Sequence, residues 1–217
     1  MEDVSGRVDD TARDDLLQTV RQFDTDYPAD RRTPNLLTEL ATLFDAQPAA
    51  KKKLLEEAAG RTTDENVRKR INDDLRRIAL LGKPLDLRLQ PWEGGPPIDL
   101  AARRGRVVVI LFWASWSLPS LHELARLEQD ATQFAGKPVD FLTVSLDQDR
   151  AALASTIKVA NLHWPVHCDG RGWEGELVRS VGLNALPTVW VLDQQGTLLT
   201  LNARDQAADV IRQALAR

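Results

Sequence analysis

Two serines, Ser117 and Ser120, stand three residues apart directly after a strand-like apolar run and two tryptophans. Cysteines at this spacing, placed at the start of a helix, would exchange disulfides through a thiolate. A serine hydroxyl is far too weak an acid to ionise near pH 7, and it forms no disulfide. We therefore expect that no redox cycle runs through Ser117 and Ser120.

A histidine close to the first serine suggests a second kind of chemistry, in which the serine is a nucleophile and the histidine is its general base. Ser117 and His122 are five residues apart, and on one helix this separation places the two side chains on different faces. The chain also lacks the G-x-S-x-G turn that exposes a nucleophilic serine in hydrolases. The pattern therefore favours Ser117 as the N-cap of a helix and His122 as a surface residue.

The sole cysteine, Cys168, ends the strand-like segment 164–168. One cysteine excludes an intrachain disulfide and a zinc site of the C-x-x-C type. We interpret Cys168 as a buried strand residue, with a peroxidatic or regulatory thiol as the open alternative. His163, His167 and Asp169 are further possible metal ligands, but in an extended chain the two histidines share a face that Cys168 does not. We predict no metal and no cofactor.

The composition is that of a globular protein with one domain and an extension, or with two small domains. The 217 residues are 43% hydrophobic and 28% charged, and the net charge is −4 with acids and bases interspersed. This balance provides no basic face for nucleic acid. No run approaches the ~18 apolar residues of a membrane-spanning helix. Residues 1–10 lack the basic and apolar regions of a signal peptide. We expect no nucleic-acid partner and no transmembrane segment.

Hydrophobic periodicity changes near residue 82. Residues 1–82 carry apolar stripes with helical spacing and predict an N-terminal all-helical region. Residues 83–217 alternate between strand-like and helix-like segments, which predicts an α/β domain with a central mixed sheet flanked by helices. The expected strands are 85–90, 106–113, 139–146, 188–193 and 197–202, and the expected helices are 120–136, 149–160 and 204–217.

Four segments of the second region resemble the thioredoxin superfamily, and most closely its TlpA/ResA branch of extracytoplasmic thiol–disulfide oxidoreductases. The segment "FWASWSLPS" (112–120) is similar to that branch's F-W-A-x-W-C-x-P-C motif, with serine at both cysteine positions. "GLNALPTVWVLDQQG" (182–196) resembles its proline segment, and "PIDLAARRGRVVVILFW" (97–113) its lead-in hairpin and central strand. Residues 145–173 are similar to its long insert. The resemblance covers roughly 83–217 and implies a thioredoxin-like fold.

The resemblance also assigns roles to residues around the serines. It makes Pro187 the expected cis-proline beside the motif. Trp116 would contribute apolar surface that substrates touch, and the backbone of Leu186 would pair with an extended polypeptide. Such pairing does not need the cysteines, so polypeptide binding can persist where redox activity is lost.

Three functions follow from serines at the two cysteine positions, Ser117 and Ser120. The first is a redox-inactive module that binds or scaffolds polypeptide in the groove around Trp116 and Leu186. The second is a thiol–disulfide oxidoreductase whose C-x-x-C was mutated to S-x-x-S. The third is a thiol peroxidase-like activity through Cys168. The resemblance implies a location on the periplasmic side of a bacterial membrane.

Overall fold

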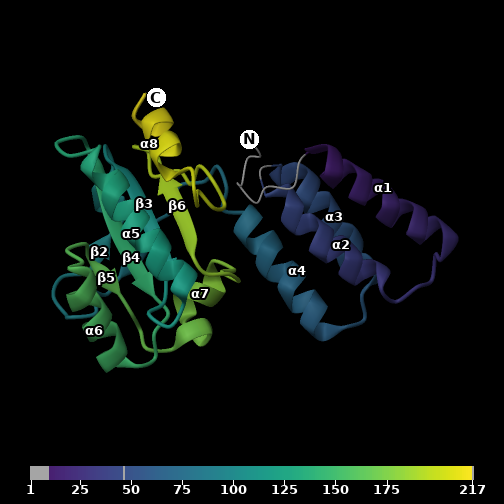
Figure 1. Cartoon of the computed structure of the whole chain (residues 1–217), viewed down its shortest axis with the longest axis horizontal. Helices are drawn as coiled ribbons and strands as arrows, with labels where there is room; N and C mark the ends of the chain where they lie inside the picture. Colours follow the sequence, from purple (N-terminus) through teal and green to yellow (C-terminus); the bar gives the residue numbers. More distant parts are fainter. Residues whose placement is uncertain (1–9, 46, 217) are drawn as a thin grey trace, which may run out of the picture. The chain divides into compact units, whose positions relative to one another are not determined.

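A computed structural model describes residues 10–45 and 47–216 of the chain. These residues form two compact units, one that extends to Ile78 and one that begins at Ala79 (Figure 1). Most of residues 1–10, the segment without signal-peptide features, lies outside the described residues. No helix of the described ranges is long and apolar enough to cross a membrane.

The first unit is all-helical, as its apolar stripes predict. Its helices are α1 (Asp10–Asp26), α2 (Thr33–Ala41), α3 (Pro48–Arg61) and α4 (Glu65–Ile78), with a 3-10 turn η1 (Thr42–Phe44) after α2. The helices meet in one core of aliphatic and aromatic side chains, which includes Leu37, Leu55, Ala58 and Ile71. The core is built from the apolar stripe of each helix, because no single helix here can bury its own stripe.

Charged side chains are buried in this helical unit. Lys51 on α3 and Arg77 on α4 are 2% and 8% exposed, and both approach the buried carboxylate of Asp74. The Lys51 ammonium lies 3.6 Å from an Asp74 oxygen and 2.5 Å from the more exposed Asp45. Because an unpaired charge is costly away from water, these carboxylates offset the burial of the two cations, and Asp74 is shared by both.

The second unit is built on a mixed sheet, as predicted, and this sheet has four strands in the described part of the chain. The strand order is β5-β4-β3-β6, and β3 pairs in parallel with β4 and antiparallel with β6. The bounds are β3 (Val107–Trp113), β4 (Val139–Ser145), β5 (Val166–His167) and β6 (Thr188–Leu192). A separate two-stranded ribbon joins β1 (Arg88–Leu89) to β2 (Ile98–Asp99).

Helices cover the sheet and complete its two cores (Figure 1). They are α5 (Leu118–Thr132), α6 (Arg150–Ala160), α7 (Glu176–Ser180) and α8 (Ala207–Leu215), with 3-10 turns η2 (Ala101–Arg103) and η3 (Gly172–Glu174). Every residue of β3 is buried, as expected of a strand paired and covered on both sides. Its side chains alternate: Phe112 packs in the core with α7, whereas Leu111 and Trp113 pack with α5, α6 and α8.

Two strand predictions need correction. The predicted strand 85–90 is reduced to β1, and the predicted strand 197–202 does not form. The latter segment leaves regular pairing with β6. Leu199 N–H donates to Val191 O at 2.9 Å, but the next backbone–backbone hydrogen bond to β6 comes only from Ala203 N–H. The Leu201 carbonyl instead accepts the indole N–H of Trp190 at 3.1 Å. Alternating apolar residues therefore indicated a strand where a bulged loop lies.

Candidate functional site

The two serines lie at the junction of β3 and α5. Ser117 has extended backbone angles and is the N-cap of α5, and its Oγ accepts the backbone N–H of Ser120 at 3.4 Å. Pro119 lies in the first turn, where a missing N–H costs the helix nothing. The predicted cap is confirmed, and the hydroxyl of Ser117 satisfies one of the free donors at the helix start.

Ser120 is in a different environment from Ser117. It is 0% exposed, and its Oγ has no hydrogen-bond partner among the described residues. A buried hydroxyl without a partner loses about 1–3 kcal/mol relative to one that is paired. A thiol would incur less of this loss, because cysteine behaves as a small hydrophobe with a weak donor. The surroundings of Ser120 therefore suit a sulfur atom better than a hydroxyl.

Large apolar side chains are exposed on either side of the Ser117 cap. Trp116 is 61% exposed and Leu118 is 63% exposed, whereas Trp113, at the end of β3, is fully buried. Exposed apolar surface of this kind is what a binding site offers to an apolar partner. They give the start of α5 an apolar rim.

The predicted proline segment lies at the same edge of the sheet. The Leu186–Pro187 peptide bond is cis. Because β3 and β6 are antiparallel and Phe112 is opposite Thr188, the residue before β6 lies beside the end of β3. The side chain of Leu186 packs against the core, while no hydrogen bond within the described residues engages its backbone N–H or C=O. The structure thus brings Leu186 and Pro187 next to the β3–α5 loop.

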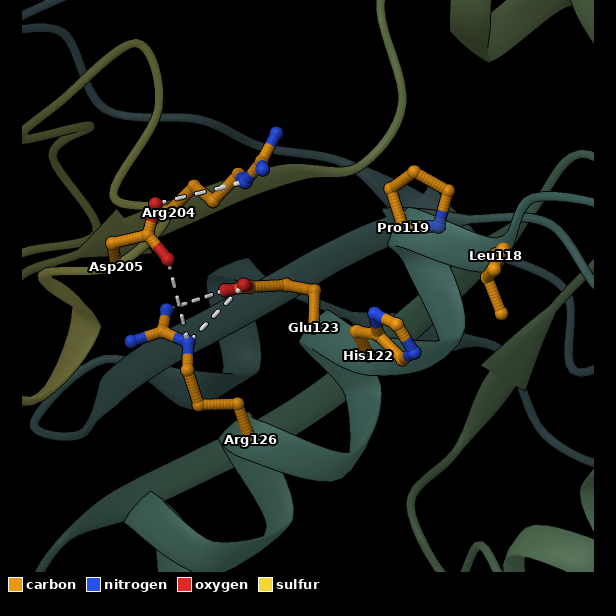
Figure 2. A pocket seen from close by; sticks show the side chains of 7 residues that line it. All are labelled: Leu118, Pro119, His122, Glu123, Arg126, Arg204 and Asp205. Carbon is orange, nitrogen blue, oxygen red and sulfur yellow. Dashed lines mark hydrogen bonds and ion pairs between the residues drawn. The ribbon is translucent and has the colours of Figure 1, made fainter. Parts of the chain in front are cut away.

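A hollow of about 400 Å³ opens along α5 beyond Leu118 (Figure 2). It is lined by Leu118, Pro119, His122, Glu123, Arg126, Arg204 and Asp205. Glu123 is buried and accepts two hydrogen bonds from Arg126, at 2.6 and 3.2 Å. Burial disfavours the charged form of Arg126, but the Glu123 and Asp205 carboxylates outweigh this effect and raise the pKa of the guanidinium. Arg126 therefore brings a cation to the wall of the hollow.

His122 belongs to this hollow and does not serve Ser117. It is exposed, as predicted, and it lines the hollow from α5. The Oγ of Ser117 is directed to the backbone of Ser120 instead, and no hydrogen bond among the described residues links the serine to the histidine. This arrangement does not make a nucleophile with a base.

Sequence reasoning missed a buried carboxylate beside the motif, that of Asp147. It is 2% exposed, and it accepts hydrogen bonds from the backbone and hydroxyl of Ser115 and from the hydroxyl of Ser145. One signal was available: Asp147 comes directly after a buried strand, at the carboxyl edge of parallel strands where α/β proteins build their sites. Its partner Ser115, 32 residues earlier, could not be identified without the fold.

Cys168 is half-buried and follows β5 rather than lying within it, which corrects the interpretation as a buried strand residue. Its thiol donates to the carbonyl of Asp147 at 3.2 Å. Of its neighbours, His163 is exposed, and His167 places Nδ1 2.7 Å from the carbonyl of Gln90. Within the described residues, no group of three or more His, Cys, Asp or Glu side chains could hold a metal ion.

Two curated thiol–disulfide oxidoreductases are similar to part of this chain. The chain is 25% identical over 121 residues to the thiol–disulfide oxidoreductase ResA of Bacillus thuringiensis, which is 56% of this chain and 68% of that protein. It is 26% identical over 98 residues to the sporulation thiol–disulfide oxidoreductase A of Bacillus subtilis, which is 44% of this chain and 58% of the relative.

Solved structures give the same result for the fold. A thiol–disulfide oxidoreductase from Bacteroides fragilis superposes with a TM-score of 0.53 at 26% identity, over 59% of this chain and 96% of that one. The thioredoxin domain of a thiol–disulfide oxidoreductase from Bacteroides vulgatus superposes with a TM-score of 0.56 at 16% identity, over 62% and 97%. The predicted thioredoxin-like fold is confirmed.

The family comparison covers the same part of the chain. The AhpC/TSA family model matches residues 82–200, which is more than half of the chain. The match runs through the serine motif, the loop that holds Asp147 and the segment that contains the cis peptide bond. The chain belongs to the AhpC/TSA family of thioredoxin-like proteins, and within it resembles the thiol–disulfide oxidoreductases.

Proposed function

We propose that this chain is a redox-inactive thioredoxin-like module that holds an extended polypeptide segment at the edge formed by Trp116, Leu186 and Pro187. The observation that carries the proposal is the exposed indole of Trp116 beside the start of α5, at the sheet edge where the backbone of Leu186 has no hydrogen-bond partner within the described ranges. Together they offer an apolar contact and an unpaired stretch of backbone to an incoming chain.

The lack of redox activity rests on chemistry rather than on geometry. Thiol–disulfide exchange needs an attacking thiolate and a second thiol that resolves the mixed disulfide. Ser117 and Ser120 occupy the two positions at the helix start, and the sequence contains one cysteine, Cys168. Neither hydroxyl can form a sulfur–sulfur bond, so the chain as written has no dithiol at this site.

Polypeptide binding rests on two groups that do not depend on sulfur. A backbone N–H and C=O free of partners can add an extended segment by strand pairing, which gives affinity for many sequences. A solvent-exposed tryptophan adds apolar area at low cost in side-chain entropy. Leu186 supplies the first and Trp116 the second, and neither contact requires a cysteine at position 117 or 120.

The test is binding of fluorescein-labelled, carboxymethylated insulin B chain, an extended peptide without thiols, followed by fluorescence anisotropy. We expect Trp116→Ala to weaken binding at least about tenfold, within the range for aromatic anchors. Val159→Ala is the matched control, since Val159 is an 85% exposed apolar residue on α6 rather than at the β3–α5 loop. Absence of binding by the wild-type chain would reject the proposed function.

A second candidate function is that of a thiol–disulfide oxidoreductase whose cysteine pair has been replaced by serine. The observation that favours it is the buried, unpartnered Oγ of Ser120, a position suited to sulfur. In this candidate, a dithiol at positions 117 and 120 would reduce a substrate disulfide to two thiols and itself become a disulfide.

The double variant Ser117→Cys, Ser120→Cys tests the second candidate. With dithiothreitol as the reductant that regenerates the dithiol, the oxidoreductase candidate requires the variant to accelerate the reduction of insulin disulfides. Ser117→Cys alone is the control, because one cysteine at the helix start cannot complete the cycle. No acceleration by the double variant would rule out an oxidoreductase scaffold that lacks only its dithiol.

A further inference from the structure

We propose that Asp147 is a positioning residue that fixes the β3–α5 loop and so sets where Trp116 meets a bound polypeptide. The expected effect on binding rests on the proposed function. The geometry by which Asp147 holds the loop is independent of that function. Asp147 is 2% exposed and cannot itself touch a partner. It acts through Ser115, the residue immediately before Trp116.

The Asp147 carboxylate accepts three hydrogen bonds from Ser115, the first residue after Ala114 in the loop. The backbone N–H of Ser115 lies 3.0 and 3.2 Å from the two carboxylate oxygens, and its hydroxyl donates to Oδ1 at 2.5 Å. Hydrogen bonds to an ionised acceptor are shorter and about twice as strong as those between neutral groups. Ser115 is thereby held in both main chain and side chain.

The carboxylate is itself fixed to the sheet. Ser145, the last residue of β4, donates its hydroxyl to Oδ2 of Asp147 at 2.6 Å and accepts the backbone N–H of Asp147 at 3.0 Å. The carbonyl of Asp147 accepts the thiol of Cys168 at 3.2 Å. Since β4 is an inner strand of the sheet, Ser115 is tied to a strand that is paired on both sides.

Trp116 needs such support because its own side chain makes few contacts that would fix its position. The indole is 61% exposed, and among the described residues no hydrogen bond, ring contact or cation–π contact holds it. Its place is therefore decided by its neighbours: Ser115, bound to Asp147, and Ser117, whose N–H donates to Ala114 O at 3.1 Å. An ordered aromatic anchor loses less entropy on binding than a mobile one.

A double-mutant cycle tests this coupling. We expect Asp147→Ala to weaken binding of the labelled insulin B chain at least about fivefold, because Trp116 is no longer held in place. In a Trp116→Ala background the same change should have less than about a twofold effect, since residues that act through one another are not additive. Equal effects of Asp147→Ala in the two backgrounds would overturn the proposal.

Loss of a buried carboxylate also destabilises the domain, so two further variants isolate positioning. Asp149→Ala removes the neighbouring carboxylate that caps α6, which lowers stability without releasing Ser115, and we expect its binding to stay within about twofold of wild type. Ser115→Ala removes only the 2.5 Å hydroxyl bond and is the milder variant if Asp147→Ala does not fold. If Asp149→Ala weakens binding as much as Asp147→Ala does, the loss of binding is due to lower stability, and the positioning role is rejected.

A measurement without any peptide separates this inference from the proposed function. The measurement is the NMR resonance of the Trp116 indole N–H, which is assigned by its absence in Trp116→Phe. This resonance should shift or broaden in Asp147→Ala and should keep its position in Asp149→Ala. An unchanged signal in Asp147→Ala would reject positioning even if the peptide binds. A shifted signal in a chain that does not bind peptide would support positioning and reject the proposed function.

Discussion

Trp113 and Trp116 are three residues apart at the end of β3, yet one is fully buried and the other is 61% exposed. Trp113 is the last residue of the strand and packs in the core shared with α5. Trp116 lies in the loop that follows, after the chain has turned away from the sheet. The same residue type is therefore part of the core at one position and, under the proposed function, contacts a bound polypeptide at the other.

This difference predicts opposite outcomes for two identical substitutions. Trp113→Ala should lower the free energy of unfolding by about 3–5 kcal/mol, because it empties a large core site. Trp116→Ala should change it by less than about 0.5 kcal/mol, as at an exposed position. Urea unfolding followed by tryptophan fluorescence measures both, since all six tryptophans lie in the second unit. A large loss with Trp116→Ala would contradict its exposure.

Ser120→Ala should stabilise the second unit by about 1 kcal/mol. The change removes a buried hydroxyl that has no partner in the described part of the chain, and alanine adds no polar group. Ser120→Cys should stabilise it as well, because a thiol tolerates burial. Urea unfolding of the two variants measures the gain. Lower stability for both would mean that a partner satisfies the Ser120 hydroxyl.

Ser117→Ala should have the opposite effect and lower stability by about 0.5–2 kcal/mol. Its hydroxyl caps α5 by accepting the backbone N–H of Ser120, and alanine cannot replace it. Ser117→Asp, which retains an acceptor and adds a negative charge at the helix start, should restore the loss. The same unfolding experiment measures both. Equal stability of Ser117→Ala and wild type would show that the 3.4 Å bond contributes nothing.

In the helical unit, Asp74→Ala should be strongly destabilising, by about 3–5 kcal/mol. It removes a buried carboxylate that Lys51 and Arg77 share, and leaves Lys51 with only the more exposed Asp45 among these two carboxylates. Asp73→Ala is the neighbouring control, because Asp73 pairs with the more exposed Arg76 and should cost less than about 1 kcal/mol. Far-UV circular dichroism during thermal unfolding compares the two variants, and similar losses would contradict the burial of the network.

The helical unit should also lose stability in acid through Asp24. Hydrogen bonds from the Arg61 guanidinium lower the pKa of the Asp24 carboxyl below its usual value near 4. The stabilisation is therefore complete above that value and is lost as pH falls through the lowered pKa. Because both side chains are partly exposed, we expect less than about 1 kcal/mol.

A comparison of variants on α1 isolates this effect. Asp24→Asn should lower the midpoint of thermal unfolding at pH 7 and should converge with wild type as the pH falls towards 2. Asp26→Asn is the control on the same helix, because Asp26 accepts a hydrogen bond from Gln22 and not from a cation. A difference between wild type and Asp24→Asn that stays constant from pH 7 to pH 2 would disprove the ion-pair origin.

The sequence was sufficient for features whose cause is local. The continuous apolar run of β3 requires burial on both faces, and a serine before Leu-Pro is a strong helix cap, so β3 and the Ser117 cap were predictable. The failed strand 197–202 shows the limit of periodicity. Its apolar alternation is correct for a strand, but the Leu201 carbonyl is taken by the indole of Trp190, a side chain of another strand.

The support of the candidate site was not predictable for the same reason. Ser115 and Asp147 come into contact only after β3 and β4 pair in parallel. The local sequence around either residue does not predict this contact. The burial of Ser120 likewise follows from how α5 packs on the sheet. Residue types indicated where chemistry was expected, while the contacts that hold those residues depend on pairing over long distances in sequence.

The central position of β3 has a consequence for how the chain folds during synthesis. β3 is paired with β4 on one side and with β6 on the other, and β6 is the last strand to leave the ribosome. Until then one edge of a fully apolar strand stays open, whereas the helical unit has contacts that are complete early. The nascent domain is thus most exposed to aggregation between the synthesis of Trp113 and that of Leu192, the interval in which a chaperone would be of most use.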